Sequence, residues 1–153
     1  MKKVIVMLLV LVLCTVAEVA KADFTFGEPT NLGPTVSSSE DADPCISADG
    51  LELYFNSYNR PGGYGGYDMW VATRQNKDAD WGTPVNLGPT VNWGVYDHDP
   101  DISADGLSLF FSSTRPGGYG SGDLWVTTRA TKNDPWGEPV NLGTTLNSSY
   151  DEA

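Results

Sequence analysis

Two acidic clusters hold the residues whose types and spacing come nearest to a chemical site. One is Glu40-Asp41-Ala42-Asp43, and the other runs from Asp97 to Asp101 around His98, the one histidine of the chain. Carboxylate and imidazole groups so placed suit a polar ligand or a hard cation such as Ca²⁺. Their order matches no known calcium loop, and the alternative is a pair of solvated loops whose aspartates cap the next strand. We therefore predict no metal site and take as ligand-binding candidates Asp41, Asp43, Asp97 and Asp99.

The nucleophile candidates do not form a catalytic set. Cys45 would need a base within reach, and His98 lies far along the chain. Ser47 and Ser103 each stand two residues before an Asp-Gly pair, where a hydroxyl serves to bond the turn backbone. We predict a non-enzymatic protein with no catalytic residue and no cofactor.

Glycine-rich segments at 61–66 and 116–122 do not have the pattern of a phosphate-binding loop. No Lys-Ser/Thr pair follows either one, and the next segment has the alternation of a strand rather than a helix. We expect hairpin loops. Their tyrosines, if exposed, offer ring faces for sugars, although packing inside the protein is the alternative use; these residues are Tyr64, Tyr67 and Tyr119.

Composition and charge exclude some partners and suggest a compartment. The net charge of -11 repels nucleic acid phosphates, so we expect no nucleic acid partner. Residues 1–22 have the pattern of a signal peptide: two lysines, an apolar run over 4–16, and Ala20-Lys21-Ala22 as the cleavage site. The alternative is an uncleaved anchor. We predict an exported protein, periplasmic or extracellular, whose mature part keeps Cys45 as its one cysteine and forms no internal disulfide.

The part of the chain after the leader, 23–153, consists of repeats. Trp81-Gly82-Thr83-Pro84-Val85-Asn86-Leu87-Gly88 returns almost unchanged 55 residues later at 136–143, and a related segment stands 55 residues earlier at 26–33. The segment 60–65, Arg-Pro-Gly-Gly-Tyr-Gly, returns identically at 115–120. One common period indicates a repeat architecture with units at about 26–80 and 81–135 and the start of a third at 136–153.

Each repeat alternates apolar and polar residues with period two, as strands do. In the second repeat we expect four short antiparallel strands, at about 101–103, 107–112, 123–129 and 138–142, in a fold that is all-β. Large residues such as Phe110 on the second face indicate that both faces of the sheet are covered. We also expect Arg60 to pair with Asp68 and Arg115 with Asp123 across the hairpin base, and Trp81 and Trp136 to pack between repeats.

These repeats resemble the WD-repeat-like β-propeller repeats of TolB type. The resemblance rests on Pro44-x-x-Ser47-x-Asp49-Gly50, on its copy at 100–106, and on the Asp-apolar-Trp steps at 68–70 and 123–125. It covers essentially all of 26–153. It implies propeller blades of four antiparallel strands and a rigid scaffold for binding.

About 2.4 repeats follow the leader, whereas a closed propeller has about four to eight blades. We therefore expect an incomplete propeller, either a fragment of a longer protein or a chain that self-associates to complete a ring. The predicted function is an exported non-enzymatic scaffold for a protein or glycan partner in the cell envelope or extracellular space. The alternative is the propeller part of a larger secreted hydrolase or lyase whose catalytic residues lie outside this chain.

Overall fold

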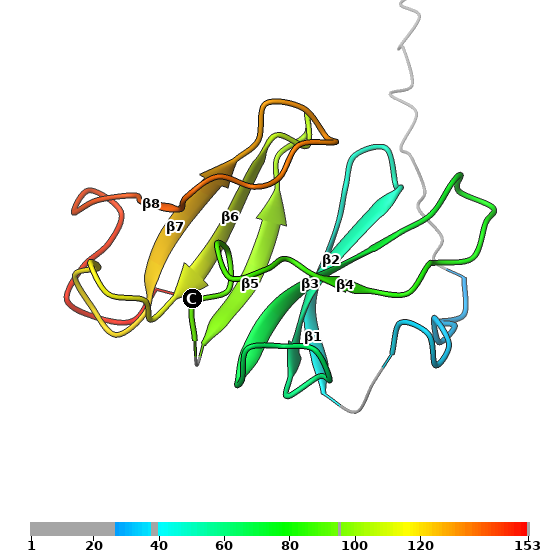
Figure 1. The fold of residues 1–153 in the computed structure, drawn as a ribbon, viewed down its shortest axis with the longest axis horizontal. Helices are drawn as coiled ribbons and strands as arrows, with labels where there is room; N and C mark the ends of the chain where they lie inside the picture. Colours follow the sequence, from blue (N-terminus) through cyan, green and yellow to red (C-terminus); the bar gives the residue numbers. More distant parts are fainter. Residues whose placement is uncertain (1–26, 38–39, 95, 153) are drawn as a thin grey trace, which may run out of the picture. The chain divides into compact units, whose positions relative to one another are not determined.

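The computed structural model describes residues 27–37, 40–94 and 96–152, and it is all-β (Figure 1). Within these ranges there is no helix, and so none long and apolar enough to cross a membrane. Residues 31–152 belong to one compact unit. The predicted signal peptide at 1–22 lies outside the described residues.

The predicted repeats 26–80 and 81–135 each supply the first three strands of one four-stranded antiparallel sheet, and the fourth strand comes from the start of the next predicted repeat. From here on, the first and the second repeat mean the first and the second sheet with their loops. The first sheet contains β1 (Asp41–Ile46), β2 (Glu52–Tyr58), β3 (Tyr67–Thr73) and β4 (Val85–Asn86). The second contains β5 (Asp97–Ile102), β6 (Ser108–Ser113), β7 (Asp123–Thr128) and β8 (Val140–Asn141). Strand β5 contacts β1, β2 and β3, so the second sheet packs against the first through its own first strand (Figure 1).

The turn between β1 and β2 shows why the Ser-x-Asp-Gly sequence recurs. The Ser47 hydroxyl donates to Asp49 Oδ1 at 2.6 Å and accepts from the amide of Glu52 at 2.9 Å. Gly50 has φ 74°, a value that a residue without a Cβ adopts at little cost. The same bonds recur around Ser103 in the turn between β5 and β6. Local turn chemistry therefore sets both hairpins.

The acidic clusters are not loops, which corrects the expectation from the sequence. They form β1 and β5, and β5 begins at Asp97 rather than near residue 101. Both strands carry a register shift, between Ala42 and Cys45 and between His98 and Asp101. Asp43 and Asp99 lie in these bulges with φ of 51° and 55°. A proline, which has no N–H to leave unpaired, follows each of them.

Two apolar clusters form the core. The larger one joins the sheets: Met69 from the first sheet and Leu109 and Phe111 from the second are at most 1% exposed. The smaller one covers the other face of the first sheet, where Val36 packs with residues such as Phe55 and Trp70. The core is thus continuous across the repeat boundary.

One expectation about sheet coverage is wrong for the second repeat. Tyr54 and Phe110 occupy corresponding places in β2 and β6. Tyr54 is 1% exposed because the second sheet covers it, whereas Phe110 is 39% exposed. The face of the second sheet that carries Phe110 is therefore open around that residue, although the segment at Glu152 covers Ser112 on the same face.

Candidate functional site

The four predicted ligand-binding aspartates divide into two structural anchors and two bulge residues. Asp41 lies 3.4 Å from Arg60 Nη1, and Asp97 lies 2.9 Å from Arg115 Nη2. The predicted pairing of Arg60 with Asp68 and of Arg115 with Asp123 is therefore wrong. An arginine bound to the first residue of its own sheet holds the loop and the strand together, so Asp41 and Asp97 each have a structural role.

Asp97 is the more deeply buried anchor. Its side chain is 1% exposed, and it accepts hydrogen bonds from the Ser113 hydroxyl at 2.6 Å and from the Trp93 amide at 2.7 Å. Arg115 also donates to the Val91 carbonyl and lies over the Phe111 ring, 4.7 Å from its centroid. These contacts offset the cost of burying the two charges and leave Asp97 no access to a ligand.

Asp68 and Asp123, the expected partners of the arginines, instead hold the glycine-rich loops. Asp68 accepts from the Tyr64 amide at 2.7 Å, and Asp123 accepts from the amides of Tyr119 and Gly120. Burial raises the pKa of Asp68. The loop tyrosines Tyr64 and Tyr119 are each 54% exposed.

The bulge of β1 opens onto a pocket of about 210 Å³ between the two sheets. Strands β1, β2, β3 and β5 and the residue before β5 supply its walls, which are formed by Ala42, Asp43, Asn56, Tyr67, Tyr96 and His98. Of the predicted aspartates, Asp43 lines this pocket. Asp99 does not line it but lies beside it, with its Oδ2 2.5 Å from Nδ1 of His98, which is a lining residue.

The polar groups of the pocket are held in position. Asn56 donates from Nδ2 to Asp43 Oδ2 at 2.8 Å, while its own Oδ1 is buried without a hydrogen-bond partner in the structure. The remaining lone pairs of Asp43 and the ring of His98 offer acceptor and donor groups to a ligand. The pocket can therefore bind a group with several hydroxyls.

Stacked tyrosines form the apolar side of the same pocket. The rings of Tyr67 and Tyr96 stack at 5.9 Å with 26° between their planes, and Tyr58 packs on Tyr67 at 5.0 Å. Tyr58 and Tyr96 are 41% and 47% exposed. A β-bridge between Tyr67 and Tyr96 fixes this arrangement across the repeat boundary. The pocket thus combines exposed aromatic surface with a carboxylate, an amide and an imidazole.

Neither a metal centre nor an activated thiol forms around these residues. In the described part of the chain, no three or more of the His, Cys, Asp and Glu side chains gather in a set that could hold a metal ion. Cys45 lies at the junction of the sheets, where its Sγ is 3.5 Å from Asp101 Oδ1 and accepts from the Ile102 amide at 3.4 Å. Burial raises the pKa of this thiol, so it is a weaker nucleophile than an exposed cysteine.

The sequence pointed to Asp43 but missed Asn56 and Tyr96. One signal was available, because the two repeats differ at this place. Tyr67 opens the strand before Asp68, and Gly122 stands in the same place before Asp123. The surroundings of the two positions differ, because a Cβ at Gly122 would meet the Asp151 carboxylate, whereas Tyr67 stacks on Tyr96. No protein-family model and no curated protein matches this sequence.

Proposed function

We propose that this chain is an exported, non-enzymatic scaffold of propeller blades that binds a neutral glycan in the pocket of Asp43 and Tyr67. The observation that carries the proposal is the convergence of a carboxylate, an amide, an imidazole and stacked tyrosines on one cavity at the repeat boundary. Pyranose rings have an apolar C–H face that packs on aromatic rings and a rim of hydroxyls that bond such polar groups.

The blade architecture is supported by the two four-stranded antiparallel sheets in chain order and by the packing of one sheet on the next. Repeated four-stranded sheets are the units of a propeller. The proposed export rests on the leader pattern at 1–22.

The small volume of the pocket and the net charge of the chain limit the ligands that the site can take. A volume of about 210 Å³ is below the roughly 300–1,000 Å³ of sites for drug-sized ligands. The net charge of -11 disfavours polyanionic glycans and nucleic acids. Compared with a peptide, a neutral sugar also better matches a pocket that offers short polar groups beside ring faces.

The test is calorimetric titration of the purified chain with three neutral probes: maltopentaose, cellopentaose and chitotetraose. We expect one of them to bind. Asp43→Asn and Tyr67→Ala should each weaken binding about tenfold or more, which corresponds to about 1.4 kcal/mol. Tyr119→Ala is the matched control, since this tyrosine is exposed in the loop of the other repeat. Unfolding midpoints establish that each variant is folded.

Two results would overturn the proposal. If none of the three probes binds, or if binding survives both Asp43→Asn and Tyr67→Ala, the pocket is not a neutral-glycan site. Chromatography of the probes after incubation separates binding from catalysis. Shortened products would contradict the non-enzymatic part of the proposal and support a hydrolase.

A further inference from the structure

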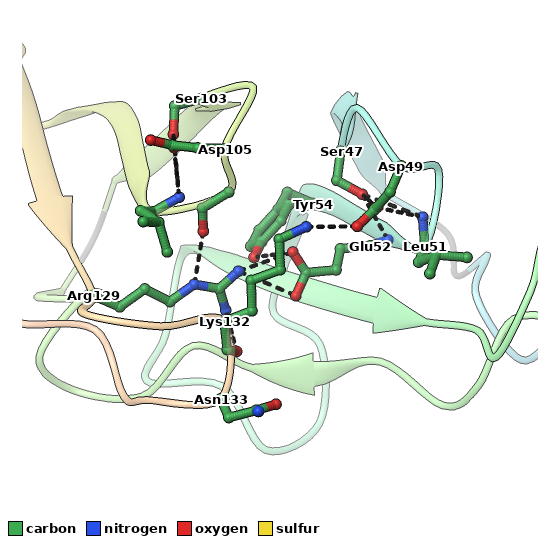
Figure 2. A network of polar contacts seen from close by, with 12 residues as sticks. Ser47, Asp49, Leu51, Glu52, Tyr54, Ser103, Asp105, Arg129, Lys132 and Asn133 are labelled. Carbon is green, nitrogen blue, oxygen red and sulfur yellow. Dashed lines mark hydrogen bonds and ion pairs between the residues drawn. The ribbon is translucent and has the colours of Figure 1, made fainter.

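The junction between the two repeats is built from charge pairs that cross from one repeat to the other (Figure 2). Glu52, in the first repeat, accepts two hydrogen bonds from Arg129 Nη2, at 3.2 and 2.9 Å. Lys132 Nζ lies 2.5 Å from Asp49 Oδ2. Both acceptors belong to the hairpin of β1 and β2, and both donors follow β7. The hairpin of one repeat therefore docks on the segment after the third strand of the next.

An aromatic contact accompanies these charges. The rings of Tyr54 and Trp136 meet edge to face, with centroids 6.4 Å apart. Arg129 lies over the same Trp136 ring, 4.4 Å from its centroid. The junction thus has a defined set of parts: an acidic turn and an aromatic residue on one side, and a lysine, an arginine and a tryptophan on the other.

The first repeat has a surface like the basic side of this junction, and none of the described hairpins places a carboxylate on it. Arg74 is held as Arg129 is, through the carbonyls of Gly50 and Lys77, both at 2.8 Å, and over the Trp81 ring at 4.3 Å. Its Nη2 finds no carboxylate among the described residues, in contrast to that of Arg129.

Two hollows mark the same surface of the first repeat. The larger hollow, of about 350 Å³, lies beside Arg74 and Trp81. The smaller one, of about 130 Å³, lies over Leu53 and Phe55. Leu32 lines both hollows. In the second repeat, the corresponding surface is filled by the side chains of the first sheet.

The second repeat presents the acidic side a second time. Asp105 accepts from the Ser103 hydroxyl at 2.6 Å and from the Leu107 amide at 2.9 Å, in the same turn geometry as Asp49. It is exposed. Phe110 stands where Tyr54 stands in the first repeat and is 39% exposed. One part differs, because Ser108 takes the place of Glu52.

We infer that a second copy of this chain docks head to tail, with the Asp105 hairpin of one copy on the Arg74 surface of the other. Phe110 then meets Trp81 as Tyr54 meets Trp136, and Asp105 pairs with Lys77 as Asp49 pairs with Lys132. Ser108 brings no carboxylate to Arg74, so this contact is weaker than the junction within the chain. Such a contact joins two different surfaces and forms rings or filaments according to its rotation.

This inference goes beyond the proposed function and does not depend on it. The surfaces involved contain neither Asp43 nor Tyr67, and no ligand takes part. Failure of sugar binding would leave the docking prediction unchanged, and a monomeric chain would leave the sugar site unchanged.

The test is sedimentation velocity of the purified chain over a range of concentrations. We expect concentration-dependent assembly that Phe110→Glu and Lys77→Glu each abolish. Ser108→Glu restores the carboxylate of the internal junction. It should tighten assembly up to about fivefold, the effect of an exposed ion pair of about 1 kcal/mol. An unchanged unfolding midpoint in Ser108→Glu separates this gain from aggregation of misfolded chains.

Val140→Glu is the matched control on the second sheet. Val140 is 64% exposed, and Val85, its counterpart in the first repeat, stays 63% exposed at the internal junction. The control should therefore assemble like the unchanged chain. A monomer at every concentration, with Ser108→Glu included, would overturn the inference. Assembly that persists in Phe110→Glu and Lys77→Glu would also overturn it, because the contact would then use another surface.

Discussion

Equivalent arginine–aspartate pairs in the two repeats do not contribute equally to stability. Arg60 follows β2 and Arg115 follows β6, the equivalent strand of the second sheet, and each contacts the first aspartate of its own sheet. The side chains of Arg115 and Asp97 are 7% and 1% exposed, and their nitrogen and oxygen atoms lie 2.9 Å apart. Those of Arg60 and Asp41 are 12% and 19% exposed, with the atoms 3.4 Å apart. The second repeat therefore depends more strongly on its arginine, because the partner carboxylate is shut off from water.

We predict that Arg115→Ala lowers the free energy of unfolding by about 3–5 kcal/mol, since it leaves the Asp97 carboxylate buried without its cation. Arg60→Ala should cost clearly less, because water reaches both members of that pair. Urea unfolding at pH 7, followed by circular dichroism, measures both. Equal losses in the two variants would contradict the reading of Asp97 as the buried anchor.

At the scale of elements, the two Asp-Gly hairpins have the same turn but different neighbours. Asp49 bonds Ser47 within its turn and reaches across to Lys132 (Figure 2). Asp105 makes the same turn and forms no ion pair with the residues that the structure describes. The two hairpins therefore differ in the close ion pair that Asp49 alone forms with Lys132.

We predict that Asp49→Asn lowers the free energy of unfolding more than Asp105→Asn does. The difference should equal the contribution of an exposed ion pair, about 0.2–1 kcal/mol. Hydrogen bonds from Lys132 and Ser47 hold the pKa of Asp49 well below its usual range. Its stabilisation is therefore complete above the unfolded pKa of about 3.9 and is lost as the pH falls towards the lowered value.

The measurement compares thermal midpoints at several pH values and in 1 M NaCl. The gap between the unchanged chain and Asp49→Asn should narrow as the pH falls below about 4. High salt should narrow it too, because salt screens exposed pairs. A gap that stays constant in high salt would show that Asp49 acts only within its turn, because the bonds from Ser47 and the Leu51 amide are lost with protonation but are not screened by salt.

At the scale of the whole molecule, the larger apolar cluster joins the two sheets. Leu109 of the second sheet is fully buried in a cluster that also contains Tyr54 and Met69 of the first. Loss of packing in one sheet therefore removes contacts from the other. The larger apolar cluster is shared by both sheets, and only the smaller one belongs to the first sheet alone.

We predict that Leu109→Ala lowers the free energy of unfolding by about 2–5 kcal/mol, the usual cost of emptying a core site. Leu146→Ala is the control, since this leucine is 58% exposed, and it should have little effect. Far-UV circular dichroism and tryptophan fluorescence should report one coincident transition in both variants. Two separate transitions would mean that the sheets unfold independently.

Sequence reasoning by itself determined the all-β fold and the hairpins, because alternation and turn chemistry are local properties of the chain. Ser103 and Asp105 define their turn through bonds that span only a few residues. The tertiary structure decided the rest. Arg115 bonds Asp97 rather than Asp123, Tyr54 is covered while Phe110 is not, and Tyr67 meets Tyr96 beside Asp43. These contacts depend on which sheet faces which across the repeat boundary, and two almost identical repeats carry no local signal for that choice.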